Sequence, residues 1–372
     1  MAQERFRQTG EQSFFGRWVY DRIVPQDHFL MRLDGVIPWQ RFAKKLVRYY
    51  QGKALYGPAP YNPVIIFKML LLSFLYNTSE RQTQDLVNFN LVAKCFVGLA
   101  VDEPAPDYST LSLFKSRLIE NKKTTAFEIL LQEIIAIAKE QAIVFGSLQV
   151  LDSVHVIADV NVAKDDHRQD NGQPRRDPDA AWGAKHTKKV QDQNGNTVKQ
   201  TEYFYGFKQH VSLNAATGLI TSVTHTAGNQ YDGHQVEALI TSDLAQGIPV
   251  EIATADRGYD DGDNHEFLQS KGIHSAIRLN AYRTAETNSH RQFWLALRQT
   301  TEYQAGLKER YKVERKFGEA KEQHGLRRCR YIGLLRFAVQ GFMTAITLNL
   351  KRMVAILTGD QGCSRIGAPI AA

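Results

Sequence analysis

The stretch LQVLDSVHV, residues 148 to 156, is where the hydrophobic pattern of this chain changes from helical to strand-like. Its residues alternate, so that Leu148, Val150, Asp152, Val154 and Val156 share one face of an expected strand. Four of these five side chains are apolar, and Asp152 occupies a position where the pattern predicts a core side chain. An acid in such a position is a candidate for chemistry.

The residues before this strand, 1 to about 145, are predicted to be helical. The segment NPVIIFKMLLLSFLY begins with Asn62 as an N-cap and Pro63 at the first helical position, and Ser79 with Gln82 has the spacing of a capping box. Three short helices follow with a helix-turn-helix rhythm, and the amphipathic segment TTAFEILLQEIIAIAKEQAI closes the region. This rhythm is typical of DNA-binding domains, and equally of any small helical bundle.

The residues after the strand predict an α/β domain. From about 163 to 200 the chain is polar and aperiodic, which predicts a long loop. Two β-rich runs around NAATG predict a hairpin, and a helix is expected from Tyr231 to Ala245. Asp256 follows the apolar strand VEIATA directly, at the carboxyl end where the sites of open α/β sheets gather. Taken alone, it is equally a turn residue before Gly258.

A third acid is out of place in ERYKVERKFGEAK, residues 309 to 321, which is expected to be helical. At about 100° per residue, the apolar stripe of this helix consists of Leu307, Val313, Phe317 and Ala320. Glu314 lies within that stripe, as do Arg310 and Lys321, whereas Glu319 lies on the opposite side. Two explanations fit the position of Glu314 equally. It has a role in chemistry, or it forms a buried ion pair with Arg310 at i,i+4 spacing.

The charge of the chain favours an acidic partner, nucleic acid first. The net charge is +7, and residues 305 to 352 alone carry 12 Lys and Arg against 4 Glu. The three cysteines, Cys95, Cys329 and Cys363, are isolated and form no zinc motif, which is typical of a protein of the reducing cytoplasm. The N-terminus has no secretory signal, and the longest apolar runs are interrupted by polar residues, so we expect packed helices rather than membrane spans.

The three acids, Asp152, Asp256 and Glu314, need a cation if the fold brings them together. Two unit charges about 4 Å apart repel by about 4 kcal/mol at an effective dielectric near 20. Carboxylates without cysteine or a histidine cluster select Mg²⁺ or Mn²⁺. Two such ions clamp the attacking and leaving oxygens of phosphoryl transfer. A basic protein with this site is expected to cut or join nucleic acid.

The ordered motifs resemble those of the DDE transposases of bacterial insertion sequences, in particular the group with a Y-(2)-R-(3)-E-(6)-K signature. Arg310, Glu314 and Lys321 match R-(3)-E-(6)-K, while Leu307 stands at the tyrosine position. LDSVHV is similar to the family's first-Asp strand and ATADRGYDD to its second-Asp motif. The segments YGFKQHVSLNAATGLI, TAGNQYDGHQ and GLRRCRYIGLLRFAVQGFMTAITLNLKR resemble its hairpin, the helix that follows and its C-terminal helix pair.

The resemblance implies a domain organisation. A helical DNA-binding domain over residues 1–145 would precede an RNase H-like domain over 146–352, followed by a C-terminal tail over 353–372. The RNase H-like domain would hold a mixed five-stranded sheet flanked by helices. Asp152, Asp256 and Glu314 would be the catalytic residues and would hold two Mg²⁺ or Mn²⁺ ions.

The resemblance also implies a reaction and partners. The enzyme would nick DNA at the inverted-repeat ends of an element and direct the resulting 3′-OH onto target DNA, as a homodimer in a synaptic complex on the nucleoid of a bacterial cytoplasm. Asp232, in GNQYDGH, is a lesser candidate near the site, or the cap of the helix that follows. Phosphates are expected to be bound by Arg310, Lys321, Arg327, Arg328 and Arg330. The last three arginines would otherwise cap helix carbonyls or pair with acids of the protein.

Two other functions fit parts of the pattern. One is an RNase H-like metal nuclease that cuts without joining, such as a junction resolvase, against which the separate helical domain argues. The other is a domesticated relative that only binds DNA. A binding module gains nothing from a carboxylate cluster that faces DNA, so the three intact acids argue against it.

Overall fold

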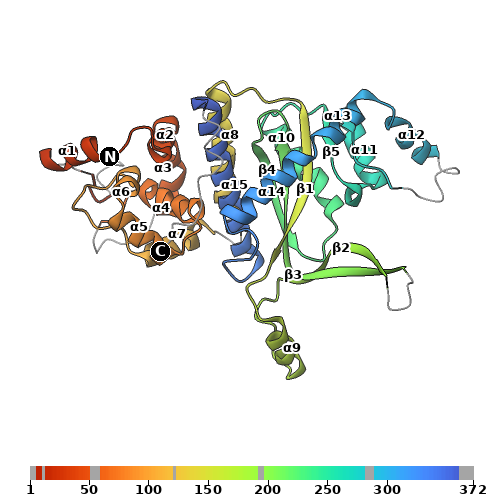
Figure 1. Cartoon of the computed structure of the whole chain (residues 1–372), viewed down its shortest axis with the longest axis horizontal. Coiled ribbons are helices and arrows are strands. Elements are labelled where there is room, and N and C mark those ends of the chain that lie inside the picture. The colour runs from red at the N-terminus through yellow and green to blue at the C-terminus, as the bar shows by residue number, and fades with distance from the viewer. Residues whose placement is uncertain are drawn as a thin grey trace. The chain divides into compact units, whose positions relative to one another are not determined.

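The computed structural model describes residues 6–10, 13–50, 59–119, 123–191, 197–280 and 289–359 (Figure 1). The chain divides into two compact units, one made of Met1–Ala142 with Met343–Ala372 and the other of Ile143–Phe342. Helix α15 (Leu334–Thr358) begins in the second unit and ends in the first. The expected domain boundary at residue 352 therefore differs from the observed one, because the end of α15 clusters with the N-terminal helices.

The first unit is helical, as predicted. Its helices before the α15 segment are α1 (Phe14–Ile23), α2 (Phe29–Val36), α3 (Gln40–Leu46), η2 (Val47–Tyr50), α4 (Pro63–Leu75), α5 (Glu80–Phe89), α6 (Leu91–Val97), α7 (Tyr108–Leu118) and α8 (Thr125–Glu140). The predicted caps are confirmed: Asn62 Oδ1 accepts from Val64 N at 2.9 Å, and Ser79 and Gln82 form a capping box. Every residue of α4 is buried, so this helix is the core of the unit.

The second unit is built on a six-stranded sheet. Its strands are β1 (Leu148–Ile157), β2 (Ala181–Gln191), β3 (Thr197–Asn214), β4 (Ile220–Ala227), β5 (Ile252–Thr254) and β6 (His274–Ser275). Strands β4, β3 and β1 pair antiparallel, and β1, β5 and β6 pair parallel. The order β4-β3-β1-β5-β6 is the expected mixed sheet of five strands, and β2 adds a sixth by pairing with the first half of β3.

The loop predicted over residues 163 to 200 is wrong for most of its length. The segment forms helix α9 (Val162–Asp170), strand β2 and the start of β3. Figure 1 shows β2 and β3 as a long hairpin that extends beyond the rest of the sheet. Its strands pair with each other from Ala181–Gly206 to Gln191–Thr197. Backbone pairing of this kind needs no alternating apolar side chains, so the sequence carried no strand signal there.

Helices cover both faces of the sheet. On one face Leu151 packs with residues of α10 (Val236–Ala245) and α11 (Gly262–Ser270). On the other, α13 (Thr301–Glu309) and α14 (Tyr311–Gln323) contact β5 and β1. Short 3-10 helices η3 (Asp232–Gln235) and η4 (Arg257–Tyr259) contact each other, and α12 (Ser289–Leu297) precedes α13. The predicted hairpin around NAATG, the helix that follows it and the strand before Asp256 are all confirmed.

No helix within the described residues is long and apolar enough to cross a membrane. Cys95 and Cys329 are free thiols, and Cys363 lies outside the described residues.

Candidate active site

Asp152 and Asp256 lie at the same level of the sheet. Strands β1 and β5 run parallel with Val150 paired to Thr254, and each aspartate follows its strand residue by two positions. Because neighbouring strands are about 4.8 Å apart and side chains alternate, this register directs both carboxylates to the same face. Asp256 is held there by its own turn, since its Oδ1 accepts from Gly258 N at 2.8 Å. Parallel pairing thus brings together two acids that are far apart in the sequence.

The face that carries these aspartates is the one that α13 and α14 cover. A close approach at Gly306 makes this possible: a Cβ at that position would lie 2.5 Å from Ala276 Cβ and 3.1 Å from Thr254 Cβ. Glycine therefore lets α13 pack directly on β5. The next helix, α14, contacts β1. The predicted single helix is in fact two, which meet at Arg310.

The predicted stripe is confirmed for its three residues on α14, whereas Leu307 is partly buried on α13. The predicted burial of Glu314 is wrong. Val313, Phe317 and Ala320 are buried, whereas Glu314 is exposed. The buried face of α14 is narrower than predicted, and Glu314 lies outside it. No ion pair joins Arg310 to Glu314, both of which are described, so the alternative interpretation as a buried pair is wrong too. Glu319 is half-buried and pairs with Lys316 at 3.2 Å.

The electrostatics identify Asp152 as the centre of the cluster. Burial, countered by the Ser153 N–H and then reinforced by Asp256, raises the pKa of Asp152 to about 7. Arg310 lowers this pKa and Asp232 raises it. The site therefore holds a carboxyl group that is costly to ionise without a neighbouring cation.

Two cations of the signature segment lie within electrostatic reach of Asp152. Arg310 is partly buried, and its Nε has no hydrogen-bond partner. Lys321 is partly buried, and burial together with the neighbouring Lys185 and Arg327 lowers its pKa, while Asp152 opposes that shift. Both predicted phosphate-binding residues of α14 are thus near the site. Lys185, on β2, was missed because it lies in the segment taken for a loop.

The acid that the sequence treated as a lesser candidate, Asp232, lies beside the cluster. It accepts from Ser153 Oγ at 2.7 Å and from Lys208 Nζ at 2.7 Å. Tyr259 is fully buried nearby, and burial, followed by the three aspartates, raises its pKa well above the usual value. Ser153, Lys208 and Tyr259 were missed by the sequence analysis. Only the positions of Ser153 next to Asp152 and of Tyr259 three residues after Asp256 offered any signal.

The three arginines after α14 lie along the end of β1. Ile157 N donates to Arg327 O at 3.1 Å, and Cys329 N donates to Ile157 O at 2.7 Å. The side chain of Arg327 pairs with Glu322, and that of Arg328 pairs with Asp159 at 2.9 Å. Arg330 N donates to Gln340 Oε1 at 2.7 Å. The alternative prediction, that these arginines pair with acids of the protein, therefore holds for Arg327 and Arg328. Exposed ion pairs of this kind contribute little stability.

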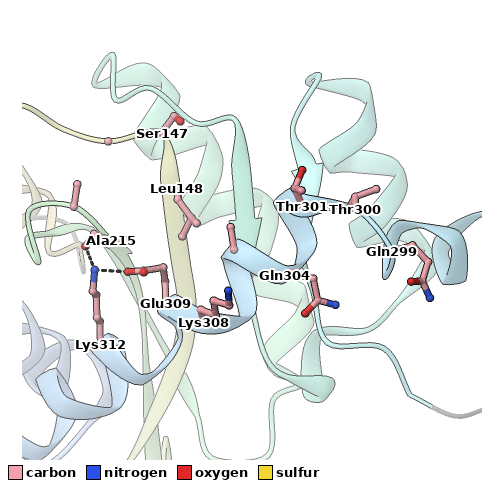
Figure 2. Close-up of a pocket in the computed structure, with 13 residues that line it drawn as sticks. Ser147, Leu148, Ala215, Gln299, Thr300, Thr301, Gln304, Lys308, Glu309 and Lys312 are labelled. Atoms are coloured by element: carbon pink, nitrogen blue, oxygen red, sulfur yellow. Dashed lines mark hydrogen bonds and ion pairs between the residues drawn. The ribbon is translucent and has the colours of Figure 1, made fainter.

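A pocket of about 640 Å³ lies at the other end of β1 (Figure 2). Leu148, Gln304 and Lys308 are among its lining residues. Lys312 donates to Ala215 O at 2.8 Å there and pairs with Glu309. Since Asp152 lies four residues further along the strand, about 13 Å away, this pocket is separate from the acid cluster. Among the described residues, no group of three His, Cys, Asp or Glu is arranged to hold a metal ion.

The sheet order and the acids at its centre define an α/β domain of the RNase H-like class. Two family models match the chain: Transposase domain (DUF772) over residues 18–117 and Transposase DDE domain over residues 166–350. Together they match more than half of it. The chain belongs to the DDE transposases, enzymes that cleave DNA and transfer its strands and that generally use divalent metal ions. Asp152 precedes the range matched by the DDE domain.

Solved structures that resemble the chain include one transposase at low sequence identity. It is a piggyBac transposase in a synaptic complex with hairpin DNA, with a TM-score of 0.42 and 8% sequence identity over 93% of this chain and 78% of that one. A similarity of this size adds no weight to the assignment, which depends on the two family models.

Proposed function

We propose that Asp152, Asp256 and Glu314 form the catalytic site at which this transposase cleaves DNA at the ends of an insertion sequence and joins the 3′-OH to target DNA. The observation that carries the proposal is the parallel register of β1 and β5, which sets Asp152 level with Asp256 beside Arg310. Helix α14, which carries Glu314, contacts the strand that carries Asp152.

The carboxylates of Asp152 and Asp256 fit a divalent ion by the chemistry of their donor atoms, although the described residues hold no group of three acids already arranged around one. Asp152 has a carboxyl group whose ionised form is disfavoured by burial, and Asp256 has one carboxylate oxygen engaged by Gly258 N. Hard cations prefer such oxygen ligands. A bound cation would offset the cost of ionising Asp152, because its positive charge stabilises the carboxylate. Mg²⁺ or Mn²⁺ would be held by Asp152, Asp256 and Glu314.

Glu314 is assigned to this set from its spacing in the signature and its position on α14. It follows Arg310 by four residues and precedes Lys321 by seven, so all three lie on one side of the helix. Arg310 lowers the pKa of Asp152. The charge of Asp152 in turn raises the pKa of Lys321. The exposure of Glu314 is compatible with a ligand at an open site that admits DNA.

The proposed acids and the basic residues near them would have different roles in phosphoryl transfer. Bound divalent ions would activate the attacking oxygen and stabilise the leaving one. Arg310 and Lys321 would hold the phosphate next to the scissile bond. Both interact electrostatically with Asp152, and neither forms a salt bridge with an acid among the described residues. Arg327, Arg328 and Arg330 would hold phosphates further along the strand.

The first unit would recognise the inverted-repeat ends, and two copies of the chain would join two ends in a synaptic complex. The helices α5, α6 and α7, with their short connections, support a DNA-reading role for this unit. A protein with these substrates would work on DNA in the bacterial cytoplasm.

A strand-transfer assay with element-end DNA, supercoiled target and Mg²⁺ tests the site. Asp152→Asn, Asp256→Asn and Glu314→Gln should each reduce cleavage and joining by more than the about 10–100-fold loss typical of a residue that only supports a ligand. DNA binding should change little. Glu319→Gln is the matched control on the same helix.

Two outcomes would change the assignment. Loss of activity in Glu319→Gln with activity retained in Glu314→Gln would move the third acid and refute the site. Cleavage without joining by the wild-type chain would favour the nuclease alternative.

A further inference from the structure

A chain of polar contacts lies on the face of β1 opposite to Asp152. Because side chains alternate along a strand, Ser153 points to the face opposite to that of Asp152. Its hydroxyl donates to Asp232 Oδ2 at 2.7 Å. Lys208, which is opposite His155 in the β1–β3 ladder, donates to Asp232 Oδ1 at 2.7 Å. Both carboxylate oxygens of Asp232 are therefore engaged by donors of the protein.

The same chain of contacts ends on the central acid of the proposed site. Ser153 N donates to Asp152 Oδ1 at 2.8 Å. Ser153 is thus held on one side by Asp232 and holds the Asp152 carboxylate on the other. A shift of Ser153 would move the donor that orients Asp152.

The ion pair between Lys208 and Asp232 is largely shielded from solvent. The side chains of Lys208 and Asp232 retain 14% and 22% of their exposure. Tyr259, fully buried, packs with Leu151 and Val236 next to this pair. At low exposure an ion pair is stronger than at the surface, and removing one partner leaves an uncompensated charge.

We propose that Asp232 is a positioning residue: paired with Lys208, it fixes Ser153 and thereby sets the orientation of the Asp152 carboxylate. The inference rests on the proposed role of Asp152 as a metal ligand. A ligand role for Asp232 itself would require an ion to displace Lys208 or Ser153. The charge of Lys208 already compensates that of Asp232, so the pair gains nothing from a further cation.

The test uses the full-length chain in four variants: Asp232→Asn, Lys208→Met, the double variant that combines them, and Asp166→Asn. The last is a matched control, because Asp166 also pairs with a basic residue, Arg175, at 3.0 Å, but on α9. Mn²⁺ binding is measured by calorimetry without DNA, cleavage with element-end DNA, and the thermal midpoint Tm in EDTA.

Each single variant in the Lys208–Asp232 pair should lower the cleavage rate and the Mn²⁺ affinity by about 10–100-fold, with the number of bound Mn²⁺ ions unchanged. In EDTA each should lower Tm by several degrees, because one charge is left unpaired. The double variant should recover to within about tenfold of wild type, since the amide oxygen of asparagine still accepts from Ser153 and no unpaired charge remains. Asp166→Asn should match wild type in all three measurements.

The opposite results identify a ligand or exclude any role. Loss of a bound Mn²⁺ ion in Asp232→Asn, without recovery in the double variant, would overturn the positioning role. A rise of Tm for Asp232→Asn in EDTA would do the same, because it would mean that Asp232 is repelled by the other acids more than it is held by Lys208. Single variants that behave like wild type would also refute it. A wild-type chain that binds no Mn²⁺ would refute the proposed site, and the Tm results would still test the Lys208–Asp232 pair.

Discussion

Replacing Asp152 with asparagine should make the metal-free protein more stable at pH 8. The pKa of Asp152 rises from an ordinary 3.8 to about 7, chiefly through burial. Each unit corresponds to 1.36 kcal/mol, so ionised Asp152 costs the folded state up to about 4 kcal/mol. Asparagine is neutral at all pH values and keeps an oxygen that can accept from Ser153 N.

The sign of the pH dependence follows from proton binding. Between pH 4 and pH 7 the folded state binds the Asp152 proton and the unfolded state does not, so the free energy of unfolding falls as pH rises through this window. Below pH 4 both states are protonated and the penalty is absent. The gain from Asp152→Asn should therefore be about 4 kcal/mol at pH 8 and under about 2 kcal/mol at pH 5.

The measurement is thermal unfolding in EDTA at both pH values, followed by a probe in the second unit. For a domain of this size, about 4 kcal/mol corresponds to a rise of about 8–16 °C in Tm. Asp166→Asn is the control, with little change expected at either pH. Added Mg²⁺ should raise the Tm of wild type more than that of Asp152→Asn. An equal gain at pH 5 and pH 8, or a loss of stability at pH 8, would refute the account of a buried carboxyl group that needs a cation.

Three further outcomes are expected. Replacing the three arginines at 327, 328 and 330 by alanine should weaken binding to specific and random DNA alike and reduce the slope of log K against log salt by up to about 3 units, about 0.9 for each phosphate that is no longer neutralised; a lower Tm with an unchanged slope would assign them to the scaffold instead. Gly306→Ala should lower the free energy of unfolding in urea by about 1–3 kcal/mol and slow cleavage, because its Cβ would lie 2.5 Å from Ala276 Cβ. Gly318→Ala is the control: with nothing within 4 Å of its Cβ, it should raise that free energy by up to about 1 kcal/mol. Equal effects of the two would show that the approach of α13 to the sheet is not tight. Ser79→Ala should lower the unfolding free energy by about 1 kcal/mol through loss of the capping box, and an unchanged urea midpoint would contradict this.

Short-range pattern in the amino-acid sequence was enough to predict several elements of this protein. Alternation around Asp152 predicts β1, the Asn62 and Ser79 caps predict the starts of α4 and α5, and the 3.6-residue period predicts the buried stripe of α14. These features are encoded within a few residues, because caps and side-chain periods are local properties of the backbone.

Which of these elements meet depends on the folded chain. The level of Asp256 with Asp152 depends on the register of two parallel strands, and the contacts of Lys208 with Asp232 join a strand to a 3-10 helix. The hairpin of β2 and β3 forms by backbone pairing without an apolar pattern, and the exposure of Glu314 depends on how wide a contact α14 makes with the sheet. Each of these is set by backbone hydrogen bonds or packing between segments far apart in the chain, and no local preference of the residues involved records it.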